Sequence, residues 1–83
     1  MAVVIVYSSK NCPYCVSAKE LLNRKNIPFE EVRVDENPDE LAKMMTLSGR
    51  RTVPQIFIND KPIGGFDDLA ALNDSGELDK LTQ

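Results

Sequence analysis

The chain has only two cysteines, and they lie three positions apart in the stretch NCPYC, residues 11–15. Two thiols this close can form a structural disulfide, supply half of a metal site, or cycle as a reactive dithiol. The absence of histidine excludes Cys-His catalysis and zinc sites with imidazole ligands. Two thiolates alone cannot fill a tetrahedral zinc site, and closing so short a loop gives little chain-entropy stabilisation. The spacing therefore favours a reactive dithiol.

A helix is expected to begin at this cysteine pair and to run from Pro13 to Lys25, because proline suits the first helical position and apolar side chains continue at helical spacing. Cys12 then occupies the cap position, where unpaired backbone N–H groups and the helix dipole stabilise a thiolate, and Lys10 adds positive charge nearby. Such a position is typical of reactive cysteines. We expect Cys12 to be the nucleophile and the more buried Cys15 to resolve the mixed disulfide.

The apolar pattern of the whole chain predicts four strands and three helices, followed by a polar tail. Strands joined through a helix pair in parallel by a right-handed crossover, whereas a hairpin with an Asn59-Asp60 turn adds antiparallel strands. The expected fold is α/β, with a mixed four-stranded sheet and helices on both faces. Its strands are expected over 3–7, 29–34, 54–58 and 61–65, and its helices over 13–25, 38–48 and 67–73.

The length and charge of the chain narrow the kind of protein further. Its 83 residues suit a single domain, 1–83, that buries roughly 60% of the surface exposed on unfolding. The net charge of −3 is unfavourable for binding nucleic acid or an anionic membrane. The longest apolar run, residues 2–7, is far shorter than the about 20 residues that span a bilayer, and no basic segment precedes it. The expected location is the cytoplasm, where thiols are kept reduced.

Three motifs in one order and spacing, CPYC at 12–15, TVPQIFI at 52–58 and GGFDD at 64–68, resemble those of the glutaredoxins. The resemblance covers essentially the whole chain and is greatest to the small bacterial dithiol members. It implies a thioredoxin-like fold and a glutathione-dependent oxidoreductase that reduces protein disulfides and protein–glutathione mixed disulfides. It further implies a monomer that uses glutathione as co-substrate, with no permanently bound cofactor and no metal.

The same resemblance implies how glutathione binds. Pro54 would be a cis proline, which is found at only about 5–6% of X–Pro bonds, and the Val53 backbone would pair with the cysteine of glutathione. Backbone N–H groups of Phe66 and Asp67 would hold the γ-glutamyl carboxylate, and Asp67 or Asp68 would hold the ammonium. The complete set of expected glutathione contacts is Lys10, Tyr14, Thr52, Val53, Pro54, Phe66, Asp67 and Asp68.

Some contacts are left open by the sequence. Arg50 and Arg51 both precede Thr52, and the sequence does not distinguish which of them faces the ligand. Some relatives carry a polar residue on the second helix where this chain has Leu41, which removes one expected carboxylate contact. Without the family resemblance, Lys10 would be interpreted as a solvated lysine.

Two other functions are compatible with parts of the pattern. The first is a dimer that holds an iron–sulfur cluster between two Cys12 thiolates with glutathione as co-ligand, and Pro13 counts against it. The second is a thioredoxin-type electron donor reduced by a flavoprotein. The absence of tryptophan, CPYC in place of WCGPC, and the GGFDD segment count against that donor.

Overall fold

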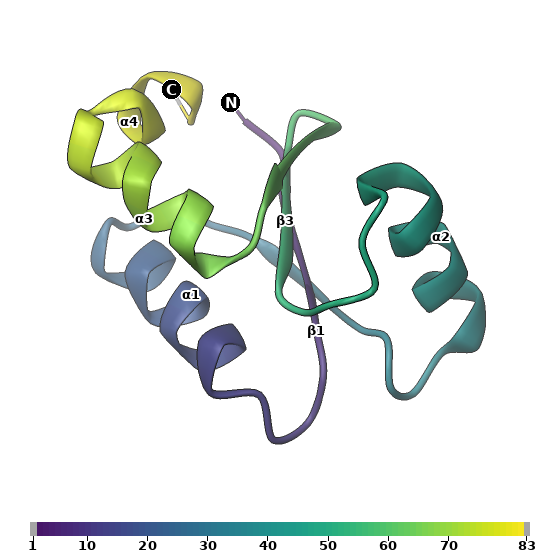
Figure 1. The fold of residues 1–83 in the computed structure, drawn as a ribbon. Coiled ribbons are helices and arrows are strands. Elements are labelled where there is room, and N and C mark those ends of the chain that lie inside the picture. Colours follow the sequence, from purple (N-terminus) through teal and green to yellow (C-terminus); the bar gives the residue numbers. More distant parts are fainter. Residues whose placement is uncertain (1, 83) are drawn as a thin grey trace.

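The computed structural model describes residues 2–82, which form one four-stranded sheet with helices against both of its faces (Figure 1). The elements alternate as predicted along most of the chain. In order, they are β1 (Val4–Ser8), α1 (Pro13–Arg24), β2 (Glu30–Arg33), α2 (Pro38–Ser48), β3 (Gln55–Ile58), β4 (Lys61–Gly64), α3 (Phe66–Ser75) and α4 (Glu77–Leu81).

The strands are arranged in the order β2-β1-β3-β4. β1 pairs in parallel with β2 and antiparallel with β3, so that Val6 lies between Glu31 and Ile56. β3 and β4 form an antiparallel hairpin whose turn residues, Asn59 and Asp60, both adopt positive φ angles. The mixed sheet, the hairpin and the thioredoxin-like fold that the sequence predicted are confirmed.

Alternate residues of β1 supply two separate core clusters, one on each face of the sheet. Val4 and Val6 point to the face covered by α1, α3 and α4, where they pack with Leu22 and Leu69. Ile5 and Tyr7 point to the face covered by α2, and Tyr7 packs edge-on against Phe57 at 5.5 Å between ring centroids. Both faces of β1 are therefore covered, as a continuous apolar run predicts. The cluster beneath α2 also includes Met44 as a buried residue and Leu41 and Met45 as partly buried ones.

The predicted polar tail was wrong. Helix α3 continues to Ser75, and the short helix α4 follows it. Gly76, with φ of 83°, ends α3 in the left-handed conformation, which glycine adopts without steric cost. The chain then turns so that Leu78, fully buried, enters the core beside Leu69. The pair Leu78 and Leu81, three positions apart, was the signal of this helix.

No helix between residues 2 and 82 has the length and apolar character needed to cross a membrane.

Candidate active site

The cysteine pair lies where β1 passes into α1. Helix α1 begins at Pro13 with Cys12 as its N-cap, and the two cysteines are joined in a disulfide with their Cα atoms 5.2 Å apart. The backbone N–H of Cys15 donates to the Cys12 Sγ at 3.1 Å. The first sulfur therefore accepts a hydrogen bond from an amide that has no partner within the helix, as the cap position predicts.

The two sulfurs differ in their access to solvent. Cys15 is 1% exposed, whereas Cys12 is partly exposed and Tyr14 beside it is 63% exposed. The Cys12 Sγ also lies 3.8 Å from the carbonyl oxygen of Val53, in the loop that precedes β3. A disulfide sulfur carries no hydrogen, so this is a contact and not a hydrogen bond. An incoming thiolate can reach Cys12 far more readily than Cys15.

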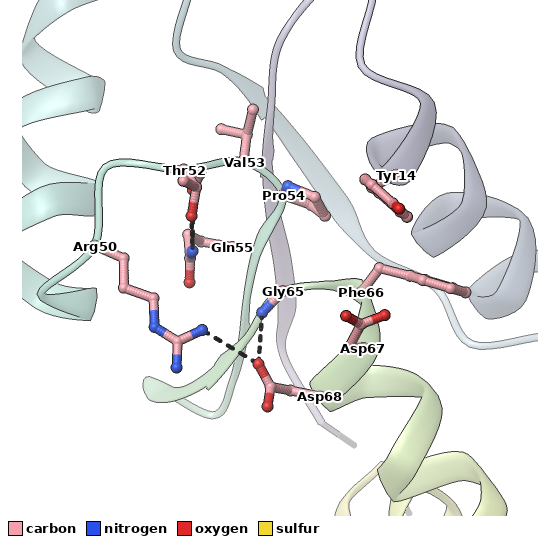
Figure 2. Close-up of a pocket in the computed structure, with 10 residues that line it drawn as sticks. All are labelled: Tyr14, Arg50, Thr52, Val53, Pro54, Gln55, Gly65, Phe66, Asp67 and Asp68. Atoms are coloured by element: carbon pink, nitrogen blue, oxygen red, sulfur yellow. Dashed lines mark hydrogen bonds and ion pairs between the residues drawn. The ribbon is translucent and has the colours of Figure 1, made fainter.

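A cavity of about 240 Å³, here called the first hollow, lies between the loop before β3 and the start of α3 (Figure 2). It contains every predicted glutathione contact except Lys10. The Val53–Pro54 peptide bond in its wall is cis, as the family resemblance implied. The residues that line it are Tyr14, Arg50, Thr52, Val53, Pro54, Gln55, Gly65, Phe66, Asp67 and Asp68.

The first turn of α3 supplies the polar end of this hollow. Phe66 and Asp67 are its first two residues, and N–H groups at these positions have no acceptor within the helix. The carboxylate of Asp68 turns back to accept from the Gly65 N–H at 3.1 Å. Gly64 permits this approach, because it has φ of 120° and a Cβ there would overlap the Asp68 carboxylate. These contacts leave two N–H groups free beside a fixed carboxylate.

Arg50 is the arginine that faces the first hollow, and Arg51 is not among the lining residues. The Nη1 of Arg50 donates to Asp68 Oδ2 at 3.2 Å, so that Asp68 bridges Arg50 and Gly65 (Figure 2). The side chain of Asp67 makes no hydrogen bond or ion pair with any other residue in the range 2–82. Of the two candidate carboxylates, Asp67 is therefore the one available to a ligand ammonium.

The rim of the hollow is aromatic. The rings of Tyr14 and Phe66 stack at 6.3 Å between centroids, with 26° between their planes. The two residues come from α1 and α3, so the stack joins the cysteine-bearing helix to the helix that supplies the free N–H groups. The stack therefore places two ring faces at the edge of the hollow, where a ligand can pack against them.

Gln55 is a lining residue that the sequence analysis missed. It is 1% exposed, and its Nε2 donates to the Thr52 carbonyl oxygen at 3.0 Å and to the Thr52 Oγ1 at 3.3 Å. These bonds fix the loop that carries Val53 (Figure 2). Its Oε1 has no partner among the described residues. In the sequence, the available signal was a glutamine at the start of an otherwise apolar strand. Because a buried polar group is costly unless it is hydrogen-bonded, such a residue is expected to have a specific partner.

A second hollow, of about 480 Å³, is lined by both cysteines and by charged side chains of α1 and β2. Lys10 lies here and not in the first hollow, so the structure separates it from the other predicted glutathione contacts. The residues that line this second hollow are Ser9, Lys10, Asn11, Cys12, Pro13, Cys15, Val16, Lys19, Glu31 and Arg33.

Most of the charged side chains that line the second hollow form ion pairs. Lys19 Nζ pairs with Glu31 at 2.8 Å, and Arg33 forms two hydrogen bonds with Asp35. The hydrogen bond from Lys19, reinforced by one from Ser8, holds the pKa of Glu31 below its usual value. The hydrogen bond from Arg33 lowers the pKa of Asp35 to about 2. Both carboxylates are thus ionised around neutral pH.

Between residues 2 and 82, no group of three or more His, Cys, Asp or Glu side chains is arranged to hold a metal ion. Leu41, where the family resemblance led us to expect one carboxylate contact to be missing, packs as a partly buried residue against the core beneath α2 and lines neither hollow.

A cysteine pair at the N-terminus of the first helix of a thioredoxin-like fold, with only the first sulfur accessible, defines a thiol–disulfide oxidoreductase. The comparisons with known proteins narrow this class to one family. The family model described as Glutaredoxin matches residues 4–63.

Curated and solved relatives agree. Glutaredoxin 3 of Escherichia coli (strain K12) is 49% identical over 81 residues, which cover 98% of each chain. The solution structure of a glutaredoxin from Brucella melitensis is 49% identical, has a TM-score of 0.87, and aligns over 99% of this chain and 89% of its own. A buckwheat glutaredoxin–glutathione complex is 29% identical, has a TM-score of 0.87, and aligns over 95% of this chain and 74% of its own. The chain belongs to the glutaredoxin family, and it is a thiol–disulfide oxidoreductase with the glutathione dependence typical of that family.

Proposed function

We propose that the chain reduces protein disulfides and protein–glutathione mixed disulfides, with Cys12 as the nucleophile and Cys15 as the resolving thiol. The observation that carries this proposal is the unequal burial of the two sulfurs at the edge of a hollow suited to a small zwitterionic peptide. The sulfur that a substrate can reach is also the one at the helix N-terminus, and it touches Val53 in the wall of the first hollow.

In the proposed complex, glutathione binds in the first hollow. The Val53 backbone pairs with the cysteine of glutathione, which places its sulfur beside Cys12. The N–H groups of Phe66 and Asp67 receive the γ-glutamyl carboxylate, and the Asp67 carboxylate receives the ammonium. Tyr14, Thr52, Pro54 and Asp68 form the surrounding wall. A relative solved as a glutathione complex shares this fold.

Lys10 would reach the glycine carboxylate of glutathione from the second hollow. Its side chain makes no ion pair with another residue of the described range, so its ammonium is available. Arg50 is the second cation near the ligand, and it holds Asp68 in place.

The proposed cycle conserves thiols and disulfides at each step. The Cys12 thiolate attacks the glutathione sulfur of a mixed disulfide, and the protein thiol leaves with the electron pair of the broken bond. A second glutathione thiolate then attacks that sulfur, releasing oxidised glutathione and regenerating Cys12. With a protein disulfide as substrate, Cys15 attacks Cys12 in the mixed disulfide instead. The product is the Cys12–Cys15 disulfide, the state in which the two sulfurs are joined in the structure, and two glutathione molecules reduce it.

We further propose that the chain works as a monomer in the cytoplasm, where the glutathione pool keeps thiols reduced, and that it needs no permanently bound cofactor. Its protein substrates are disulfide-containing or glutathionylated proteins.

The test is turnover of a small glutathione mixed disulfide with glutathione, glutathione reductase and NADPH. We expect rapid turnover by wild type and by Cys15→Ser and none by Cys12→Ser, a loss of at least a thousandfold. If Cys15→Ser were as inactive as Cys12→Ser, the assigned roles would be wrong. If wild type were inert with glutathione but cycled with thioredoxin reductase, the chain would be a thioredoxin-type donor. Visible absorption after anaerobic reconstitution with iron and sulfide would favour the cluster-binding dimer.

A further inference from the structure

The side chains of Ser8 and Lys19, from two different elements, converge on the carboxylate of Glu31 beside the cysteine pair. Ser8, fully buried at the end of β1, donates from its Oγ to the Oε2 of Glu31 at 2.5 Å. Lys19 of α1 donates from its Nζ to the same oxygen at 2.8 Å. The side chains of Lys19 and Glu31 are only 29% and 33% exposed. This Ser8–Glu31–Lys19 cluster holds a lysine ammonium in one place, where most surface lysines are mobile.

The cluster lies on the same side of α1 as Cys15. Lys19 follows Cys15 by four residues, and side chains at this spacing are neighbours on one helix face. Helical side chains lean towards the N-terminus, which directs Lys19 back over the turn that carries Cys15. Cys15, Lys19 and Glu31 accordingly line the same second hollow. None of the three lines the first hollow, where the proposed function places glutathione.

Cys15 needs such a cation at one step of the cycle. When a glutathione thiolate attacks Cys12 of the disulfide, the S–S bond breaks and its electron pair goes to Cys15, which leaves as a thiolate. The glutathione sulfur becomes bonded to Cys12. Cys12 has the helix N-terminus to stabilise its charge, and the Cys15 N–H already donates to Cys12. Cys15 is 1% exposed, so its thiolate has little water to stabilise it.

We propose that Lys19 is the electrostatic partner of Cys15. In this proposal, the ammonium of Lys19 stabilises the Cys15 thiolate and so favours the reduced dithiol, while the carboxylate of Glu31 partly cancels that charge. The balance of the two charges sets the equilibrium between the dithiol and the Cys12–Cys15 disulfide. The inference rests on the roles proposed for the two cysteines, and it adds to them a device that acts only on the second sulfur.

The alternative is an ion pair that merely fastens α1 to β2, and the two roles predict different effects. If Lys19 acts through its charge, removing the lysine cation and removing the glutamate anion shift the dithiol–disulfide equilibrium in opposite directions. If the pair only fastens α1 to β2, removing either partner has the same effect. The C-cap residue of α1, Lys25, supplies a control, because it pairs with Asp79 at 3.0 Å and neither residue lines the second hollow. Removing Lys25 therefore costs an ion pair at the end of the same helix without touching the cysteines.

The experiment measures the dithiol–disulfide equilibrium in glutathione redox buffers for wild type, Lys19→Met, Lys19→Arg, Glu31→Gln and Lys25→Met. We expect Lys19→Met to favour the disulfide at least threefold more than wild type, which is about 14 mV more negative in potential. Lys19→Arg keeps the charge and should remain within twofold of wild type. Glu31→Gln removes the opposing anion and should shift the equilibrium the other way. Lys25→Met should leave it unchanged.

A second readout shows whether the effect passes through Cys15. In a Cys15→Ser background, Lys19→Met should leave turnover of the glutathione mixed disulfide unchanged, and a drop would place the action of the lysine on Cys12 or on the substrate. Equal shifts in one direction for Lys19→Met and Glu31→Gln, or no difference between Lys19→Met and Lys25→Met, would overturn the inference. Wild-type turnover separates the two proposals: an active wild type with unshifted variants contradicts the inference alone, and an inert wild type contradicts the proposed function.

Discussion

Cys12 lines the second hollow and contacts Val53 in the wall of the first, but the two hollows are built from different chemical groups. The first is lined by the backbone around Val53, by two aromatic rings and by the first turn of α3, and its charged side chains are Arg50, Asp67 and Asp68. The second is lined by side-chain charges, and Lys19 and Glu31 are its paired members. Backbone N–H and C=O groups in fixed positions suit recognition of a peptide. Fixed charges beside a buried sulfur suit control of its ionised form. The contrast indicates that ligand binding and sulfur electrostatics are assigned to separate walls of one site.

This division makes kinetic and equilibrium measurements separable. Changes in the first hollow should raise the KM for glutathione, because they remove binding groups, and should leave the potential of the dithiol alone. Changes at Lys19 and Glu31 in the second hollow should shift the potential of the dithiol and leave the KM for glutathione unchanged.

The largest effect is expected at Gly64, where any side chain disrupts the first hollow. Gly64→Ala places a Cβ against the Asp68 carboxylate in a left-handed conformation that alanine rarely adopts. We expect the free energy of unfolding to fall by about 1–3 kcal/mol and the KM for glutathione to rise about tenfold, measured by denaturant unfolding and steady-state kinetics. The control is Gly49→Ala, with φ of 72° and open space around it. It should cost about 1 kcal/mol and leave the KM unchanged. An unaltered KM in Gly64→Ala would show that the Asp68 cap does not shape the site.

A smaller effect should distinguish the two acids at the start of α3. Asp67 is free to bind the ligand ammonium, so Asp67→Asn should raise the KM for glutathione about tenfold through loss of a charge-assisted hydrogen bond, with stability unchanged. Asp68 is engaged with Gly65 and Arg50, so Asp68→Asn should lower the free energy of unfolding by about 1 kcal/mol. The matched measurements are kinetics and urea unfolding of both variants. The reverse pattern would exchange the two roles.

The smallest effect concerns the charge of Glu31. The hydrogen bonds from Lys19 and Ser8 lower the pKa of this carboxyl in the folded state, so its ionised form stabilises the fold. That contribution is complete above the unfolded pKa, near 4.5, and is lost as the pH falls through the lowered folded pKa. For a partly exposed pair we expect less than about 1 kcal/mol at pH 7. The stability difference between wild type and Glu31→Gln should thus shrink on acidification, as measured by urea unfolding between pH 7 and pH 3. A difference that grew with falling pH would contradict this assignment.

The sequence predicted the parts of the molecule whose signals are local. The positions of Cys12 and Cys15 follow from Pro13 at the start of a helix, and the apolar run over 3–7 predicted that both faces of β1 are covered. Helix α4 was missed because its apolar residues, Leu78 and Leu81, are too few to give a clear period.

Contacts between distant elements could not be predicted in this way. Serine, lysine and glutamate are residue types that usually face solvent, so nothing in the sequence singles out Ser8, Lys19 and Glu31. Only the pairing of β1 with β2 beneath α1 brings the three together. Arg50 and Arg51 are equivalent polar neighbours in the sequence, and the loop geometry alone turns Arg50 towards Asp68. The cis peptide bond before Pro54 was predicted from the family resemblance, not from the local sequence.

The most direct test of the division between the hollows is an NMR comparison of Cys15→Ser with and without glutathione bound covalently at Cys12. The variant cannot resolve the adduct, so the glutathione stays in place. We predict that the largest amide shifts occur at Val53, Phe66 and Asp67, with contacts from the glutathione protons to these residues. Shifts centred on Lys19 and Glu31, with Val53 and Phe66 unperturbed, would place glutathione in the second hollow and contradict the account.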